Sequence, residues 1–201
     1  STSRGLGDVY KRQDMLKILS PELREKLKPR QIEALDVLVF IFYSRGMAFQ
    51  DVYRLRWSMI SDGHIRYKRS KTGALIDVEV VPELEEIMRR YHRKDSPYVL
   101  PFLHESRKGN TGKELSEKSA LRRINRAVYN IIGDVKLTTY VLRHTWATMM
   151  LEDGSPVEVI SQCMGHSSIR TTQIYLSRIS SRKIDKAVRG MYDRQLRHNV
   201  P

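Results

Sequence analysis

Apolar residues recur at helical spacing along most of the first ninety residues. Ile32, Leu35 and Phe42 fall on one face of a helix predicted over residues 29–44, and Gly46 follows where helices commonly end. The same spacing predicts shorter helices over residues 21–26, 50–57 and 82–92.

Alternation of apolar and polar residues replaces the helical period in one region. It predicts two strands, over residues 64–68 and 75–81, joined by the turn Ser70-Lys71-Thr72-Gly73. A polar stretch with two glycines, residues 104–115, predicts a loop.

The last third of the chain predicts a series of helices. They cover residues 116–132 and 140–152, then a short helix that starts with the N-cap Ser155 and Pro156 and ends at Gly165. Another short helix, capped by Ser167 or Ser168, carries Tyr175, and residues 179–196 form a basic amphipathic stretch. The fold class predicted is mainly α with a small antiparallel β-sheet, an α+β fold.

Residues 1–13 show neither a helical nor a strand period, so we interpret them as a disordered leader or a foreign scar. The chain begins with Ser1 and is expected to be a fragment of a longer protein. One domain is predicted over residues 14–201, with residues 179–201 as its C-terminal helical tail.

Charge adds the first functional information. Lys and Arg number 36 against 23 Asp and Glu, which gives a net charge of +13, and nucleic acid is the commonest intracellular partner of so basic a chain. Ribosome association, an anionic membrane surface or a basic surface without a function remain alternatives. The longest apolar run, residues 37–43, is too short to span a membrane. The single cysteine, Cys163, excludes a disulfide framework and a cysteine-built zinc site.

Four separated segments carry residue types suited to phosphate chemistry. Arg143 lies in Leu142-Arg143-His144-Thr145-Trp146-Ala147-Thr148, His166 follows Gly165, Tyr175 comes nine residues later, and Lys71 lies in the predicted hairpin turn. One guanidinium group can bind two phosphate oxygens at once through two hydrogen bonds. A tyrosine hydroxyl becomes a nucleophile when its surroundings activate it. Taken singly, the four residues could equally be an internal ion pair, a helix-end histidine, a core tyrosine and a surface lysine.

In order and spacing, these segments resemble the catalytic domain of the tyrosine recombinases, the phage integrase family, over about residues 29–190. The similarity includes the conjugative-transposon integrase branch. It implies the fold of that domain, without the core-binding domain that precedes it in the family. It also implies a site-specific DNA recombinase for integration or excision of a mobile element.

The resemblance also implies the role of each residue. Tyr175 would form a 3′-phosphotyrosine linkage, Arg143 and His166 would hold the phosphate, and Lys71 would protonate the departing 5′ oxygen. The reaction would be a metal-independent strand transfer without a cofactor. Further lysines and arginines are predicted to bind DNA. They lie in the hairpin, the polar loop and the helix after it: Lys68, Arg69, Arg107, Lys108, Lys113, Arg122 and Arg126. A solvated surface is the alternative; phosphate binding predicts steep salt dependence.

Two positions depart from the family pattern. Ala48 stands where the family usually has an arginine, and Arg45 is the predicted substitute, with Arg54 and Arg56 as weaker candidates. Tyr140 stands where the family usually has a histidine. Loss of one phosphate donor typically costs about 3–4 kcal/mol of transition-state stabilisation.

The family implies double-stranded DNA as partner, a homo-tetramer on paired sites held through the C-terminal tail, and room for an accessory DNA-bending factor. No membrane partner is expected, and the location would be the cytoplasm, at the bacterial nucleoid. Three alternatives remain: a catalytically impaired DNA-binding module, a type IB topoisomerase-like enzyme with little site choice, and a ribosomal or structural basic protein. The first predicts no covalent adduct.

Overall fold

The computed structural model describes residues 12–106, 114–129, 131–132 and 136–176. The helices are α1 (Arg12–Ile18), α2 (Pro21–Glu25), α3 (Pro29–Tyr43), α4 (Phe49–Arg54), α5 (Pro82–Tyr91), α6 (Glu117–Val128), α7 (Thr139–Glu152), α8 (Val157–Met164) and α9 (Ile169–Leu176). The strands are β1 (Ile60–Ser61), β2 (His64–Lys68) and β3 (Leu75–Glu79), and two 3-10 turns cover η1 (Trp57–Met59) and η2 (Pro101–Leu103). Among these helices we find none with the length and apolar character needed to cross a bilayer.

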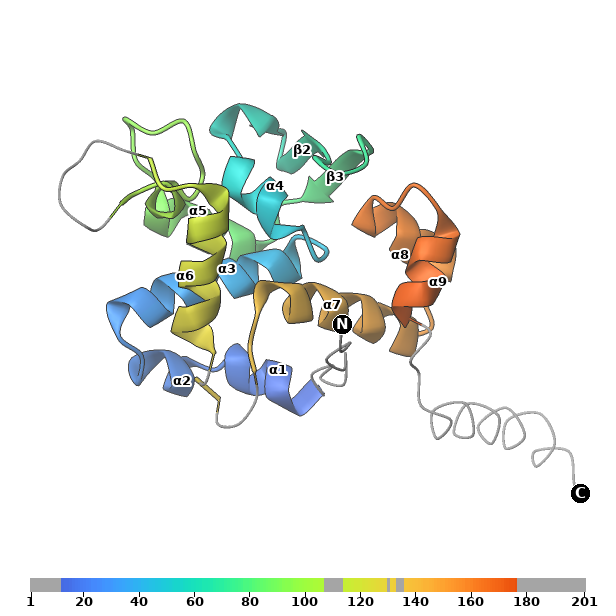
Figure 1. The fold of residues 1–201 in the computed structure, drawn as a ribbon, viewed down its shortest axis with the longest axis horizontal. Helices are drawn as coiled ribbons and strands as arrows, with labels where there is room; N and C mark the ends of the chain where they lie inside the picture. Colours follow the sequence, from blue (N-terminus) through green and yellow to red (C-terminus); the bar gives the residue numbers. More distant parts are fainter. Residues whose placement is uncertain (1–11, 107–113, 130, 133–135, 177–201) are drawn as a thin grey trace, which may run out of the picture.

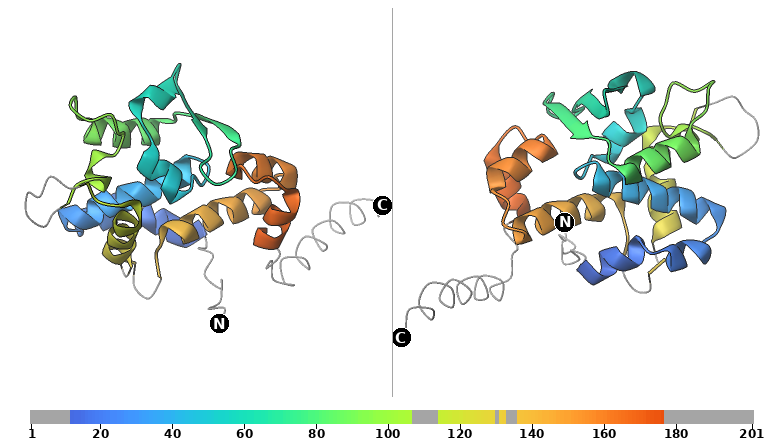
Figure 2. Two further views of the ribbon diagram at one scale, coloured as in Figure 1. Left: turned by 45° about the horizontal axis from the view of Figure 1, so that its top comes forward. Right: turned by 180° about the vertical axis from the view of Figure 1, so that it is seen from behind.

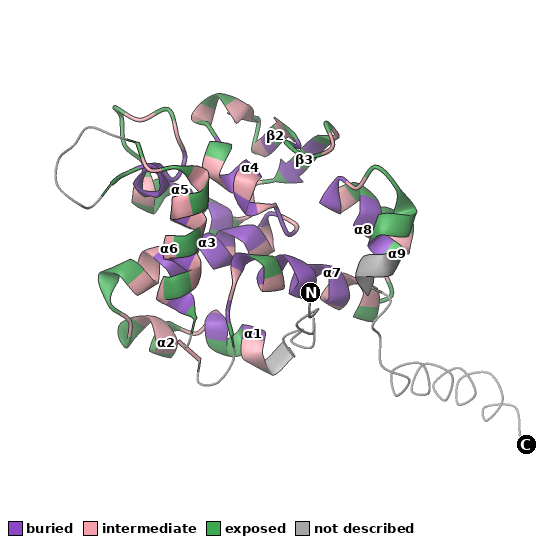
Figure 3. Ribbon diagram, viewed as in Figure 1, coloured by how far each residue is buried: buried purple, intermediate pink, exposed green. Residues whose placement is uncertain are grey.

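Helix α3 lies at the centre of the fold, and α5, α6 and α7 pack around it (Figure 1). Its residues from Ala34 to Leu38, together with Phe40 and Ile41, are buried, so α3 is enclosed on most of its circumference (Figure 3). Burial on several faces explains why the helix is apolar at consecutive positions rather than on one stripe.

The three strands form an antiparallel sheet in the order β1-β2-β3 at one side of the core. In the β2–β3 pair, His64 lies opposite Glu79 and Lys68 opposite Leu75. Ile65 and Val78 are paired and buried on the face toward the core, as the period of two residues requires. The turn between β2 and β3 therefore projects from the edge of the core, toward α8 (Figure 2).

Helices α8 and α9 form a small layer beyond the end of α7 (Figure 1). Trp146 on α7 and Ile160 and Met164 on α8 make a second apolar cluster. Gly165 ends α8 in the left-handed conformation, with φ 61°, and its amide and that of His166 bond back to Gln162 and Ser161. Ser168 accepts a hydrogen bond from the Arg170 amide at 3.2 Å, so Ser168 is the cap of α9.

Several predicted boundaries are wrong, and long-range pairing explains the largest error. The helix predicted over residues 50–57 ends at Arg54, because Leu55 accepts a hydrogen bond from Val99 and the Trp57 amide donates to Pro97. Strand β1 was not predicted, since two residues show no period. Helix α1 begins at Arg12, inside the predicted leader. Helix α8 begins at Val157, with Pro156 rather than Ser155 as its extended cap.

A buried carboxylate joins three elements of the core. The Asp36 side chain, 1% exposed in α3, accepts two hydrogen bonds from Arg24, at 2.6 and 2.7 Å. It also accepts from Arg90 at 2.8 Å and from the Tyr91 hydroxyl at 2.7 Å. Burial and the neighbouring carboxylate raise the pKa of Tyr91. The apolar pattern of α3 did not reveal this cluster.

Replacing Asp36 with alanine is expected to lower the free energy of unfolding by about 3 kcal/mol, because two guanidiniums and a phenol lose their common partner. Both arginines are about one-third exposed and can partly reach water, which keeps the loss at the lower end of the range for buried pairs. Urea denaturation measures it. Asp95→Ala, at an exposed carboxylate in a turn, is the matched control and should change stability by less than about 0.5 kcal/mol.

Candidate functional site

Arg143 lies on α7 and connects two distant segments of the chain. Arg143 is 7% exposed, and its Nη1 donates to the carbonyl of Gly46, in the turn after α3. Its Nη2 donates to the carbonyl of Met164, the last residue of α8, at 2.8 Å. The C-terminal end of a helix carries partial negative charge, so a guanidinium is stabilised there. Arg143 is therefore held at a fixed place between α3 and α8.

His166 lies beside this guanidinium. Its Nε2 is 3.5 Å from Arg143 Nη2, and its Nδ1 is 2.7 Å from the hydroxyl of Thr172, which is fully buried on α9. Partial burial, reinforced by the positive charges of Arg143, Arg69 and Lys71, lowers the pKa of His166 to about 4. The imidazole is thus neutral at pH 7 and lies among cations, an arrangement that favours an anion.

This depressed pKa predicts a pH dependence of stability. Because the folded-state pKa of about 4 lies below the ordinary 6.5, the unfolded chain binds the proton first as pH falls. The contribution of the neutral His166 to the free energy of unfolding is fully present above pH 6.5 and is lost as pH falls toward 4. Melting temperatures measured over this range should fall more steeply for the wild type than for His166→Asn; parallel curves would contradict the lowered pKa.

Lys71 is exposed in the turn between β2 and β3. Backbone hydrogen bonds of 2.8 Å, from Arg69 to Ala74 and from Gly73 to Arg69, close this turn. Thr72, next to Lys71, donates to the carbonyl of Gly165 at 2.7 Å, so the turn that carries Lys71 lies beside His166, although 95 residues separate Lys71 from His166 in the chain. Lys71, Arg143 and His166 are thus brought together.

Tyr175 lies in α9, one helical turn after Thr172, which is bonded to His166. Its side chain lies outside the part of the chain that the structure describes. The prediction that this helix carries Tyr175 is confirmed, whereas its role as nucleophile stays a prediction.

The predicted substitute for the missing arginine is not joined to this group. Arg45 has φ 59°, and its Nη1 donates to the carbonyl of Asp77 in β3 at 3.0 Å. Ala48 is the extended residue before α4, and its methyl group cannot bind phosphate. Tyr140 is 50% exposed on the first turn of α7, with its ring parallel to that of His144 at 6.5 Å.

Of the weaker candidates, Arg54 is paired with Glu117 at 3.2 Å, and the Arg56 guanidinium lies over the ring of Tyr98. Neither is bonded to Arg143 or His166 among the described residues.

The residues predicted to bind DNA fall into three groups. Lys68, Arg122 and Arg126 are exposed. Arg107, Lys108 and Lys113 lie outside the described residues. Arg69 is 7% exposed and donates to the Met164 and Gly165 carbonyls, so its guanidinium is bonded inside the protein, and its contact with DNA stays a prediction.

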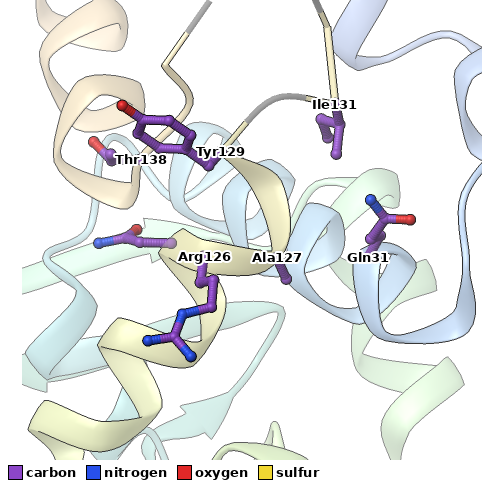
Figure 4. A pocket seen from close by; sticks show the side chains of 7 residues that line it. Gln31, Arg126, Ala127, Tyr129, Ile131 and Thr138 are labelled. Atoms are coloured by element: carbon purple, nitrogen blue, oxygen red, sulfur yellow. The ribbon is translucent and has the colours of Figure 1, made fainter.

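A hollow of about 570 Å³ lies beside α6, lined by Gln31, Tyr129 and Thr138 among others. Figure 4 shows Arg126 at its edge, with the guanidinium directed away from the Tyr129 ring. None of Lys71, Arg143 and His166 lines it, so this hollow is separate from the site.

Three residues help to build the site although their sequence pattern did not predict that role: Asp51, Thr72 and Gly165. The buried Asp51 accepts a hydrogen bond from the Ser70 amide at 2.9 Å, and Thr72 donates to the Gly165 carbonyl at 2.7 Å. The sequence signal for Asp51 was a carboxylate close to the apolar Phe49 and Val52, which are also buried. We find no group of three His, Cys, Asp or Glu side chains placed to hold a metal ion in the described ranges.

A family model and known relatives match most of this chain. The model of the phage integrase family matches residues 13–182. Tyrosine recombinase XerA of Pyrococcus furiosus is 28% identical over 181 residues, which cover 88% of this chain and 59% of that protein. XerA of Thermococcus onnurineus is 30% identical over 146 residues, covering 70% of this chain and 50% of that protein. The chain thus spans less than two thirds of these relatives' length.

Solved structures share the fold. The match to a crystal structure of XerA recombinase covers 100% of this chain and 66% of the XerA chain, with a TM-score of 0.62 and 24% identity. The match to the Tn1549 transposon integrase, solved with a circular-intermediate DNA, covers 93% of this chain and 67% of the integrase chain, with a TM-score of 0.63 and 14% identity. These matches confirm the predicted mainly helical fold with its small antiparallel sheet, which is the catalytic-domain fold of tyrosine recombinases. Because the family model matches most of its residues, the chain belongs to the phage integrase family.

Proposed function

We propose that this chain is the catalytic part of a site-specific DNA recombinase that cuts and rejoins strands through a 3′-phosphotyrosine intermediate. One observation carries the proposal: Arg143, neutral His166 and the Lys71 turn converge at the end of α8, next to the helix that holds Tyr175. Cationic groups around a neutral imidazole suit a phosphodiester, whose charge increases in the transition state.

Each residue has a defined part in the first step. The Tyr175 oxygen attacks phosphorus and loses its proton to water, while the bond from phosphorus to the 5′ oxygen breaks. Lys71 gives a proton to that 5′ oxygen, so the leaving group departs as an alcohol. Arg143 stabilises the non-bridging oxygens through its guanidinium. In the tautomer that carries its proton on Nε2, His166 donates to a third oxygen while Nδ1 stays bonded to the Thr172 hydroxyl.

Rejoining is the reverse reaction, with a 5′ hydroxyl attacking the phosphotyrosine. The ester keeps the bond energy, so neither ATP nor a metal ion enters the scheme. Integration or excision of a mobile element is the proposed use, by a homo-tetramer on paired sites that assembles through residues 179–201, with an accessory DNA-bending factor where the site requires one.

The proposed DNA surface contains the exposed Lys68, Arg122 and Arg126, with the loop cations Arg107, Lys108 and Lys113. A net charge of +13 supports this partner, because each phosphate contact releases counterions. Such a surface would place the protein on the nucleoid in the cytoplasm.

Covalent trapping tests the proposal. The protein is incubated with supercoiled plasmid and with a pool of nicked duplexes of randomised sequence, which presents many candidate sites at once, and the reaction is then quenched with detergent. We expect protein-linked DNA from the wild type and none from Tyr175→Phe, which lacks only the hydroxyl. Salt-sensitive binding without an adduct would favour a binding module, and relaxation of the plasmid without site choice would favour a topoisomerase-like enzyme.

A further inference from the structure

We propose that Arg69 and Thr72 are positioning residues that hold Lys71 in place by fastening its turn to the peptide before His166. This inference rests on the proposed function, because the task of Lys71 is defined there. Both residues flank Lys71 closely in the chain, and both donate to the same acceptor, the carbonyl of Gly165.

The fastening consists of short, partly buried hydrogen bonds. The Thr72 hydroxyl is 2.7 Å from the Gly165 oxygen, and Arg69 Nη1 is 2.9 Å from it and 2.6 Å from the Met164 oxygen. The Met164 carbonyl also accepts from Arg143, so one helix end aligns the hairpin and the Arg143 guanidinium. Carbonyls at the end of a helix lack partners within the helix, which makes them ready acceptors.

Gly165 allows the hairpin to come this close. It has φ 61°, and a Cβ built there would lie 2.8 Å from Arg69 Cδ and 2.8 Å from Ile76 Cδ1. Those distances are shorter than real Cβ contacts, so a larger residue would have to displace the Arg69 and Ile76 side chains from their places against α8. The glycine is therefore a contact surface as well as a helix cap.

Asp51 supports the turn from the opposite side. Its Oδ1 accepts from the Ser70 amide at 2.9 Å, and its Oδ2 is 3.9 Å from Arg69 Nε. Arg69 Nε has no hydrogen-bond partner among the described residues, so the pair is held by charge at that point. The residues on either side of Lys71 are thus fixed from α4 and from α8, while Lys71 itself stays exposed.

A matched pair at Thr72 tests the inference with the full 201-residue chain. Thr72→Val keeps the side-chain shape and removes the hydroxyl, whereas Thr72→Ser keeps the hydroxyl. Cleavage is measured on a normal duplex and on one in which sulfur replaces the 5′ bridging oxygen, because a thiolate, with a thiol pKa of about 8.5, leaves without needing a proton.

We expect Thr72→Val to cleave the normal duplex about 10-fold more slowly, since a small displacement of a reacting group costs one to two orders of magnitude. Thr72→Ser should cleave it at nearly the wild-type rate. On the sulfur-containing duplex all three proteins should react alike, because proton donation by Lys71 is no longer needed.

Arg69→Gln provides a second variant, with an expected loss of about 100-fold on the normal duplex and recovery on the sulfur duplex. Equal losses on both duplexes would mean that the contacts only stabilise the fold, and no loss on either would mean that they do not position Lys71; either result overturns the inference. Failure of the wild type to cleave both duplexes would instead reject the proposed function.

Discussion

Replacing Arg143 with lysine is expected to slow strand cleavage by about 10²–10³-fold while leaving DNA affinity nearly unchanged. The guanidinium is a planar fork that already spans the Gly46 and Met164 carbonyls and is oriented by them. Lysine keeps the positive charge but provides a single ammonium group, which cannot hold two segments and a phosphate in one plane. Single-turnover cleavage and equilibrium binding, measured on the same duplex, separate the two effects.

Because Arg143 also connects α3 with α8, the thermal unfolding of the Arg143→Lys protein must be measured beside its cleavage activity. We expect the Arg143→Lys protein to remain folded, since the charge at the end of α8 is retained. A folded variant that cleaves at the wild-type rate would show that Arg143 serves only the fold.

Replacing Lys71 with alanine is expected to reduce cleavage of a normal duplex by about 10²–10⁴-fold, which is the range for loss of a general acid. The same variant should cleave the sulfur-containing duplex at nearly the wild-type rate. Lys71 is exposed, so the substitution removes no packing, and stability should stay unchanged. Lys94→Ala, at another exposed lysine in a turn, is the control and should leave both rates unchanged. A Lys71→Ala protein that is slow on both duplexes would assign the proton to another group.

The spacing of apolar residues and the turn residues predicted those helices and strands whose signal lies within one segment of the sequence. The period along α3 and the turn residues between the strands gave α3 to within one residue and β2 without error, because each pattern is complete within its own segment. The order of Lys71, Arg143, His166 and Tyr175 also came from the sequence, through the family resemblance.

Contacts between distant segments account for what was missed. Arg69 looks like one more surface cation in the sequence, yet it is buried by carbonyls 95 and 96 residues away. Leu55 continues a helical pattern, but pairing with Val99 extends its backbone. Asp36 and Asp51 are carboxylates among the buried residues of α3 and α4, and their partners come from other parts of the chain. No periodicity within a segment reports such contacts.

In the proposed reaction, Tyr175 itself becomes joined to the 3′ end of the cut strand. Mass spectrometry of trypsin-digested adduct tests it most directly, because residues 171–178, which contain Tyr175, and residues 137–143, which contain Tyr140, form separate peptides. We expect a 3′-linked nucleotide on the first peptide and a free 5′ hydroxyl on the released strand. A nucleotide on any other residue, or a linkage to the 5′ end, would contradict it.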